Sequence, residues 1–249
     1  MRKALKNSAA ILFWLAVWQL AAMAANRSLL LPIPTPADTA RALCRMAAEG
    51  GFWLTLGASL LRICAGFALA LLAGIAGAAA SVRWPLFRQL AAPLVQLIRT
   101  IPVAVFTIVV FLWVSRPYIP STIVFLTVLP IVWSSVEAGL ENTDRQLAEM
   151  ARVFGMDRPA ILRQITLPGI RPYVTAAVAT GLGFAWKSGI AAEVICRTQG
   201  SLGDLLWSGK AAVSYDEVFA LTVVIVLCSS LLQAAVRPRR KGGSSHDPV

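Results

Sequence analysis

Four charged side chains lie inside long apolar stretches of the sequence, where a charge is costly unless it is paired or hydrated. Arg62, Arg99, Lys187 and Glu193 are each flanked by runs of apolar residues. A charged group at the centre of a membrane costs at least ~2.5–3.5 kcal/mol, so each needs a partner, water or a ligand. Lys187 and Glu193 lie about 600° of helix apart, so they do not share a helical face. All four are candidates for solute contact or for buried ion pairs, and the sequence leaves both open.

The residues that most enzymes use are sparse. The only histidine is His246, close to the last residue, so a His-based triad or an imidazole metal cluster is not expected. No Asp/Glu pair is spaced for acid–base catalysis, and no G-x-x-x-x-G-K-[ST] phosphate loop occurs. Cys44 and Cys196, both expected near the outer face, are candidates for a disulfide; the alternative is that these two, Cys64 and Cys228 are all inert thiols. A catalytic role is therefore disfavoured, and we expect ATP hydrolysis, if any, to come from a partner protein.

Composition and charge indicate a membrane protein. The chain is 57% hydrophobic, against roughly 45–50% apolar residues in a soluble domain, and its mean hydropathy is +0.70. Only 14% of residues are charged, yet the formal net charge is +11. The cations punctuate apolar segments, which suits contact with anionic lipid rather than with nucleic acid. We expect one membrane domain over 1–249, with no room for a separate ATP-binding domain.

Six apolar segments are long enough to span a membrane or nearly so. They cover residues 9–25, 54–80, 90–114, 121–136, 172–195 and 218–236. Pro102 is expected to kink the third, and residues 37–48 are expected to form a short amphipathic helix at the outer surface. With the N-terminus inside, Lys and Arg in the inner segments outnumber those outside by more than two to one, which favours both termini in the cytoplasm. Ala22-Met23-Ala24 resembles a signal-peptide cleavage site, so the first segment is either an uncleaved span or a cleaved leader. Arg62 falls near the outer end of its segment, where its head could reach the membrane surface.

The longest polar interruption covers residues 142–169 and predicts two short amphipathic helices. Gly155 stands where a helix C′ glycine would stand, since it adopts positive φ at little cost. Asp157 follows as an N-cap with Pro159 in the first turn. Pro168-Gly169 is expected to end the second helix. The segment is too polar to enter lipid and too apolar on one face for water, so it should dock on another protein.

This segment resembles the "EAA" loop of binding-protein-dependent ABC transporter permeases, E-A-A-x3-G-x9-I-x-L-P. Met150 stands in place of the second alanine of that pattern. In that family the loop is the coupling helix, which lies in a groove of the cytoplasmic ATPase. The resemblance therefore implies that six residues couple this chain to an ATPase: Glu149, Ala151, Gly155, Ile165, Leu167 and Pro168.

Two further stretches resemble the nitrate, sulfonate and taurine permeases of the same family. They are Arg99-x-x-Pro102 in the third segment, and Ala192-Glu193 followed by the 200–203 G-S-L-G run. Arg99 is either a cation near an anionic substrate path or a clamp on a carboxylate or the backbone. The translocation-pathway candidates are Arg99, Pro102, Trp186, Lys187 and Glu193, although family motifs serve packing as easily as substrate contact.

The fold class expected from the sequence is an all-α membrane protein with six transmembrane helices and a cytoplasmic coupling helix pair between the fourth and fifth, the type I ABC importer permease fold. The resemblance implies a bacterial inner-membrane location and three kinds of partner: cytoplasmic ABC ATPase subunits, a periplasmic or lipid-anchored substrate-binding protein, and a second permease copy. It implies no cofactor on this chain, with ATP used by the partner. The expected substrate is a small solute, with anions such as sulfonates, taurine or nitrate favoured only weakly. A secondary transporter or channel, or an intramembrane enzyme, is the alternative.

Overall fold

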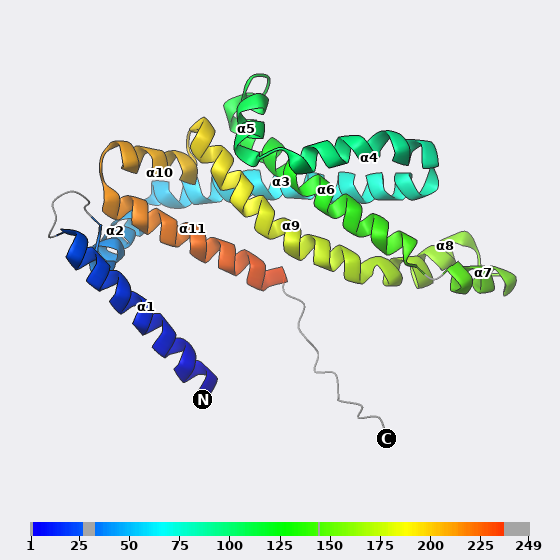
Figure 1. The fold of residues 1–249 in the computed structure, drawn as a ribbon, viewed down its shortest axis with the longest axis horizontal. Helices are drawn as coiled ribbons and strands as arrows, with labels where there is room; N and C mark the ends of the chain where they lie inside the picture. The colour runs from blue at the N-terminus through cyan, green and yellow to red at the C-terminus, as the bar shows by residue number, and fades with distance from the viewer. Residues whose placement is uncertain (1, 27–32, 144, 237–249) are drawn as a thin grey trace.

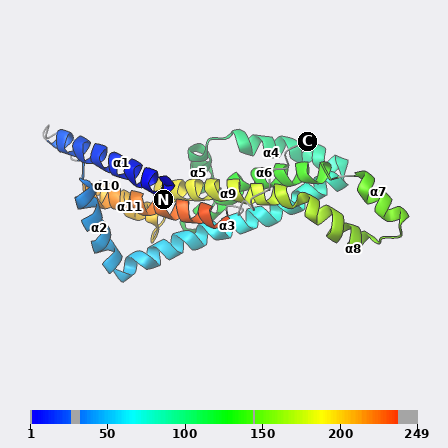
Figure 2. The same cartoon turned by 90° about the horizontal axis from the view of Figure 1, so that it is seen from below.

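The computed structural model describes residues 2–26, 33–143 and 145–236, and all regular secondary structure in these ranges is helical. Arg27 and the basic tail residues Arg237, Arg239, Arg240 and Lys241, which entered the expected orientation, lie outside the described residues. The side chains of the N-terminal basic residues are likewise not described. The helices form an elongated bundle, with α2 and α10 at one end and α7 and α8 at the other (Figures 1 and 2).

Three long helices form the centre of the bundle. They are α3 (Gly50–Arg83), α6 (Ile119–Glu141) and α9 (Leu167–Cys196). Small residues allow α3 and α6 to touch backbone to backbone: a Cβ on Gly66 would lie 2.9 Å from the Ser121 Cα, and one on Gly74 would lie 2.8 Å from the Val132 side chain. Such contacts between small residues drive helix association in lipid, where apolar burial gives no driving force. The core between the three helices includes Ile63, Val124, Val128, Val132, Ala177 and Ala185.

Peripheral helices surround this centre. α1 (Arg2–Asn26) lies at one edge, where Trp18 stacks on Phe219 of α11 (Tyr215–Val236) with ring centroids 5.9 Å apart. The amphipathic helix expected near the outer surface is α2 (Pro36–Ala48), which begins with a capping box between Thr35 and Asp38. α10 (Leu202–Ala211) is a short helix between α9 and α11. All four cysteines are free thiols, so the Cys44–Cys196 disulfide is not present.

The third predicted span, 90–114, is not one kinked helix. It is divided into α4 (Pro85–Thr100) and α5 (Val103–Phe111), whose axes differ by 106°. Pro102 has no N–H and forces the preceding residue out of the helical region, so Ile101 has φ −75° and ψ 125°. The sequence therefore located the irregularity correctly but underestimated it. The 3-10 turn Arg116–Tyr118 then leads into α6.

The polar segment contains the two expected helices, α7 (Arg145–Val153) and α8 (Arg158–Ile161). The prediction that Pro168-Gly169 ends the second one is wrong, because a π-helical segment, Leu162–Thr166, joins α8 directly to α9. Leu167 donates its N–H to the Leu162 carbonyl oxygen in the wider π turn, and Pro168 then lies in the first turn of α9, where it is tolerated. The backbone is thus helical from Arg158 to Cys196.

Four stretches of the described residues are long and apolar enough to cross a membrane: Ala9–Asn26, Gly50–Arg83, Arg116–Glu141 and Tyr215–Val236. The bent pair α4 and α5 passes the same test when taken as one span. The predicted fifth span, 172–195, lies wholly within α9, which has 30 residues but is less apolar and does not pass. The structure therefore supports an all-helical membrane protein with four or five apolar spans.

Candidate functional site

The tip formed by α7, α8 and the turn between them is shaped by the local signals of the sequence. Gly155 has φ +83°, and its N–H donates to the Arg152 carbonyl oxygen at 3.0 Å. Met156 N–H donates to the Ala151 carbonyl oxygen at 3.0 Å, which completes a Schellman motif. Asp157 accepts from the Ala160 N–H at 3.1 Å as the N-cap of α8. The predicted C′ glycine and N-cap are both confirmed.

This tip presents apolar side chains to its surroundings. Val153 is 86% exposed and Phe154 is 79% exposed. Of the six residues matched to the EAA pattern, Ala151 is buried, Ile165 is half-buried, and the others are exposed: Glu149, Gly155, Leu167 and Pro168. Large apolar side chains gathered on an exposed surface are characteristic of a protein–protein contact. The arrangement suits docking, with Ala151 packing inside the tip.

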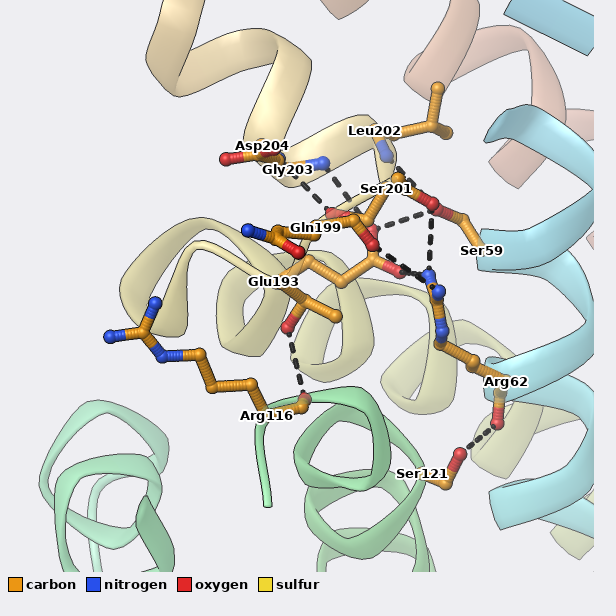
Figure 3. A network of polar contacts seen from close by, with 12 residues as sticks. Ser59, Arg62, Arg116, Ser121, Glu193, Gln199, Ser201, Leu202, Gly203 and Asp204 are labelled. Carbon is orange, nitrogen blue, oxygen red and sulfur yellow. Dashed lines mark hydrogen bonds and ion pairs between the residues drawn. The ribbon is translucent and has the colours of Figure 1, made fainter. Parts of the chain in front are cut away.

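At the opposite end of the bundle, Glu193 of α9 is completely enclosed by protein (Figure 3). Its carboxylate accepts hydrogen bonds from the Ser59 hydroxyl of α3 at 2.9 Å and from the Gly203 N–H of α10 at 3.3 Å. The Arg62 guanidinium lies 3.8 Å from the other carboxylate oxygen. Glu193 thus joins α3, α9 and α10 through three partners, and its place on a translocation pathway stays a prediction. Lys187 is not among those partners, as their helical spacing predicted.

The same network fixes the turn between α9 and α10. Arg62 donates to the Gly200 carbonyl oxygen at 3.1 Å and to the Gln199 carbonyl oxygen at 3.4 Å (Figure 3). Ser59 also accepts from the Leu202 N–H at 2.9 Å, so one serine serves both α9 and α10. Arg62 therefore binds backbone and carboxylate instead of extending to the membrane surface. Residues Ala192-Glu193 and the 200–203 G-S-L-G run, which resemble a family motif, therefore supply several groups of this network.

Trp186 and Lys187 are neighbours in α9 but have different surroundings. Trp186 is 2% exposed, and its indole N–H donates to the Ile225 carbonyl oxygen of α11 at 3.0 Å. It therefore holds α11 against α9, and its contact with a solute stays a prediction. Lys187 is exposed and forms no hydrogen bond or ion pair with any described residue. Of the two, only Lys187 is placed to meet a solute or a partner.

Arg99 lies at the end of α4, next to the break at Pro102. Its guanidinium donates to the Pro130 carbonyl oxygen of α6 at 2.8 Å and to the Ser134 hydroxyl. The backbone-clamp alternative for this residue is thus realised, although the side chain stays exposed. It also lines a cavity of about 200 Å³ between α4 and α6.

Sequence reasoning missed one charged cluster. Arg88 of α4 bridges two carboxylates of α6, with its Nε 3.2 Å from Glu137 and its Nη1 2.5 Å from Glu141. The two glutamates are four residues apart and so share one face of their helix. The four-residue spacing of the two glutamates can be recognised in the sequence. The position of Arg88 beside them cannot, because it depends on how α4 packs against α6.

The family whose model matches residues 54–241 is described as the binding-protein-dependent transport system inner membrane component. This range covers most of the described chain and both ends of the bundle. The chain belongs to this family. The permease is therefore the transmembrane subunit of an ABC importer, a system in which a separate subunit hydrolyses ATP.

Individual relatives agree with this assignment. The permease is 28% identical over 211 residues to the taurine transport system permease protein TauC of Escherichia coli K12, covering 82% of this chain and 76% of that one. It is 28% identical over 191 residues to the nitrate import permease protein NrtB of Leptolyngbya laminosa, covering 76% and 67%. A chain in the crystal structure of a bacterial alginate ABC transporter with its periplasmic protein aligns with a TM-score of 0.62 at 14% identity, covering 98% and 97%. That last similarity concerns the fold alone.

Proposed function

We propose that the permease couples to its ATPase through residues 142–169 and that the coupling residues are those of the EAA pattern. The observation that carries this proposal is the exposed apolar tip at Val153 and Phe154, because the turn that follows them leads into α8, and α8 continues without a helical break into α9. A force applied at α8 passes along one helical rod to Glu193 and α10. The Schellman turn at Gly155 gives the tip a defined shape, as a lever requires.

Orientation and partners follow from this role. The α7–α8 tip faces the cytoplasm and meets the ABC ATPase subunits, and both termini lie on that side. The α2–α10 end faces outward, where a periplasmic or lipid-anchored binding protein delivers the solute. A permease with one coupling tip needs a second copy to engage two ATPase subunits, so the working unit is a homodimer. No cofactor is required on this chain, since ATP is bound and hydrolysed by the partner.

In this proposal residues 1–249 form a single permease domain with six spans at the positions predicted from the sequence. The third span is the broken pair α4 and α5, and α9 supplies the fifth despite its lower apolarity. A less apolar span of this kind is tolerated where polar residues face a pathway or contact a second subunit. Arg99, Pro102 and Lys187 line the pathway, while Trp186 and Glu193 support it from behind.

The substrate we propose is a small solute that carries an oxyanion group, of the kind represented by taurine, other sulfonates and nitrate. Two relatives carry the names of taurine and nitrate transport proteins. Arg99 and Lys187 have no carboxylate partner among the described residues, so the uncompensated charge on the proposed pathway is positive. A positive pathway lowers the barrier for an anion.

The test is to disturb the tip while leaving the membrane region intact. Gly155→Pro removes the N–H bonded to Arg152 and is incompatible with φ +83°, and Glu149→Arg reverses an exposed charge. Both variants should remain in the membrane and lose ATP-driven uptake, by tenfold or more, in proteoliposomes containing the ATPase and binding protein.

Gly155→Asn is the matched control, because asparagine tolerates a left-handed conformation; it should retain most uptake. Full uptake by Gly155→Pro would refute the coupling role. Uptake that continues without any ATPase would instead identify a secondary transporter.

A further inference from the structure

A partly open cavity, lined by both charged and apolar side chains, lies between α4 and the paired helices α3 and α6. Its volume is about 200 Å³, below the roughly 300–1,000 Å³ of pockets for drug-sized ligands. α4 contributes five of the lining residues and has no buried residue of its own. The lining consists of Ser81, Arg88, Ala92, Val95, Gln96, Arg99, Trp133, Ser134 and Glu137.

α4 separates its polar and apolar residues between two faces. The face away from the cavity carries exposed leucines, among them Leu90 (69%), Leu94 (59%) and Leu97 (56%). The face toward the cavity carries Arg88, Gln96 and Arg99. A helix with lipid on one side and polar side chains on the other places water or a ligand on its polar side.

The two arginines of the cavity differ in their charge balance. Arg88 is paired with two carboxylates, so these three side chains together carry one net negative charge. Arg99 binds a carbonyl oxygen and a hydroxyl, both neutral, and no carboxylate of the described residues lies within ion-pair distance of it. The amide of Gln96, one turn away, forms no hydrogen bond within the described part of the chain. The deep end of the cavity therefore combines an uncompensated cation with unused donors.

The break in the third span is a second, independent indication. Irregular backbone at membrane depth is tolerated only where it is buried in protein or lines a water-filled cavity. The break at Ile101 and Pro102 begins two residues after Arg99, and α5 starts there without a side-chain cap. The irregular backbone and the unbalanced charge thus occur at the same place.

We propose that this cavity is a binding site for a small monovalent oxyanion, held by the Arg99 guanidinium and the Gln96 amide. A guanidinium matches two oxygens of a nitrate or sulfonate group with parallel N–H donors. The role of this site in transport rests on the proposed import function. The proposal adds a location for the anion, within one protomer and between α4 and α6.

A lipid phosphate offers the same chemistry, but the geometry favours a dissolved solute. Arg99 lies eleven residues beyond Arg88 along α4, which is about 16 Å deeper from the cytoplasmic end. Of the two arginines in the cavity, Arg88 lies nearer the cytoplasmic end, and it is paired with both Glu137 and Glu141. A lipid phosphate approaching from that end therefore meets a group of side chains with a net negative charge.

The experiment measures the electrostatic potential of the cavity with thiol reagents, using the full-length permease with its ATPase in phosphatidylcholine nanodiscs. Ala92→Cys supplies the reporter in a chain whose native cysteines are replaced by alanine. The rate of modification by an anionic sulfonatoethyl methanethiosulfonate is compared with that by a cationic trimethylammonium analogue. Leu94→Cys, on the leucine face, is the position control and should react with neither.

The reporter should react with both reagents and favour the anionic one. Arg99→Gln should lower the anionic-to-cationic rate ratio roughly threefold or more, since it removes one unit charge at close range. Gln96→Glu should lower it similarly while leaving the Arg99 contacts to α6 in place, so the result does not depend on α4 staying in position without its clamp. Arg83→Gln, an exposed cation at the end of α3 outside the cavity, is the matched control and should leave the ratio unchanged.

Sodium nitrate and sodium methanesulfonate should each protect the reporter, and protection should disappear in Arg99→Gln. An unreactive reporter, or a ratio unaffected by both substitutions, would overturn the proposal. Protection seen only when phosphatidylglycerol is added would assign the site to a lipid headgroup and overturn it as well. None of these measurements requires transport. The anion site can therefore be confirmed even if Gly155 has no coupling role, and the coupling role can be confirmed even if the anion site is refuted.

Discussion

At the scale of single residues, Gly203 shows how tightly the outer network is built. A Cβ at this position would lie 2.5 Å from the Glu193 Cβ and from its carbonyl carbon. The Gly203 N–H must also approach the buried carboxylate to within 3.3 Å. A side chain there would separate α9 from α10 and leave the Glu193 charge without one of its donors.

Gly203→Ala should therefore destabilise the permease by about 1–3 kcal/mol, the usual cost of overpacking a tight contact. Thermal unfolding in detergent checks this, with a fall in melting temperature expected. Gly57→Ala is the matched control, because a Cβ at Gly57 meets nothing within 4 Å and alanine favours the helix. Equal melting temperatures for the two variants would contradict the account of the network.

At the scale of elements, α4 is held mainly by polar contacts. It buries no residue, and its attachments to α6 are the Arg99 clamp, the bridge from Arg88 to Glu137 and Glu141, and one aromatic stack of Phe87 on Trp133. Partly exposed ion pairs contribute only about 0–1 kcal/mol each. α4 should thus be the most easily displaced of the helices that border the core.

The double substitution Glu137→Gln and Glu141→Gln should loosen α4 selectively. Amide hydrogen exchange over Pro85–Thr100 should accelerate several-fold, while α3 and α6 should change little. Arg41→Ala is a suitable control, since it removes an ion pair with Asp38 on α2, far from α4. An acceleration spread evenly over all helices would show that the bridge supports the whole fold instead.

At the scale of the whole molecule, the two ends of the bundle have opposite roles and should lie on opposite sides of the membrane. Phe154 lies at the α7–α8 end and Lys210 at the α10 end, and both are exposed (Figures 1 and 2). In a chain without native cysteines, Phe154→Cys should react with an impermeant maleimide only from the cytoplasmic side. Lys210→Cys should react only from the outside. Labelling of Phe154→Cys in intact spheroplasts would invert the proposed orientation and remove the tip from reach of an ATPase.

Local signals in the sequence were enough to predict the helical tip and its caps. The Gly155 turn and the Asp157 cap depend on backbone geometry within a few residues, so residue type alone determines them. The apolar segments and the EAA pattern likewise indicated a membrane permease before any fold was known, because length, apolarity and motif spacing are properties of the chain itself.

Tertiary structure decided which distant groups meet. The sequence showed that Glu193 needs a partner, but only packing of α3 against α9 and α10 supplies Ser59, Arg62 and the Gly203 N–H. The sequence predicted an irregularity at Pro102 but not the 106° bend between α4 and α5. It also predicted that a helix ends at Pro168, whereas a π-helical segment joins α8 to α9 there. The physical reason for the first is distance along the chain: Ser59 lies 134 residues from Glu193, so no local pattern of residues shows that the two meet. At Pro102 and Pro168 a proline removes one backbone donor, and the helices packed around it decide whether the backbone bends or continues through a wider turn.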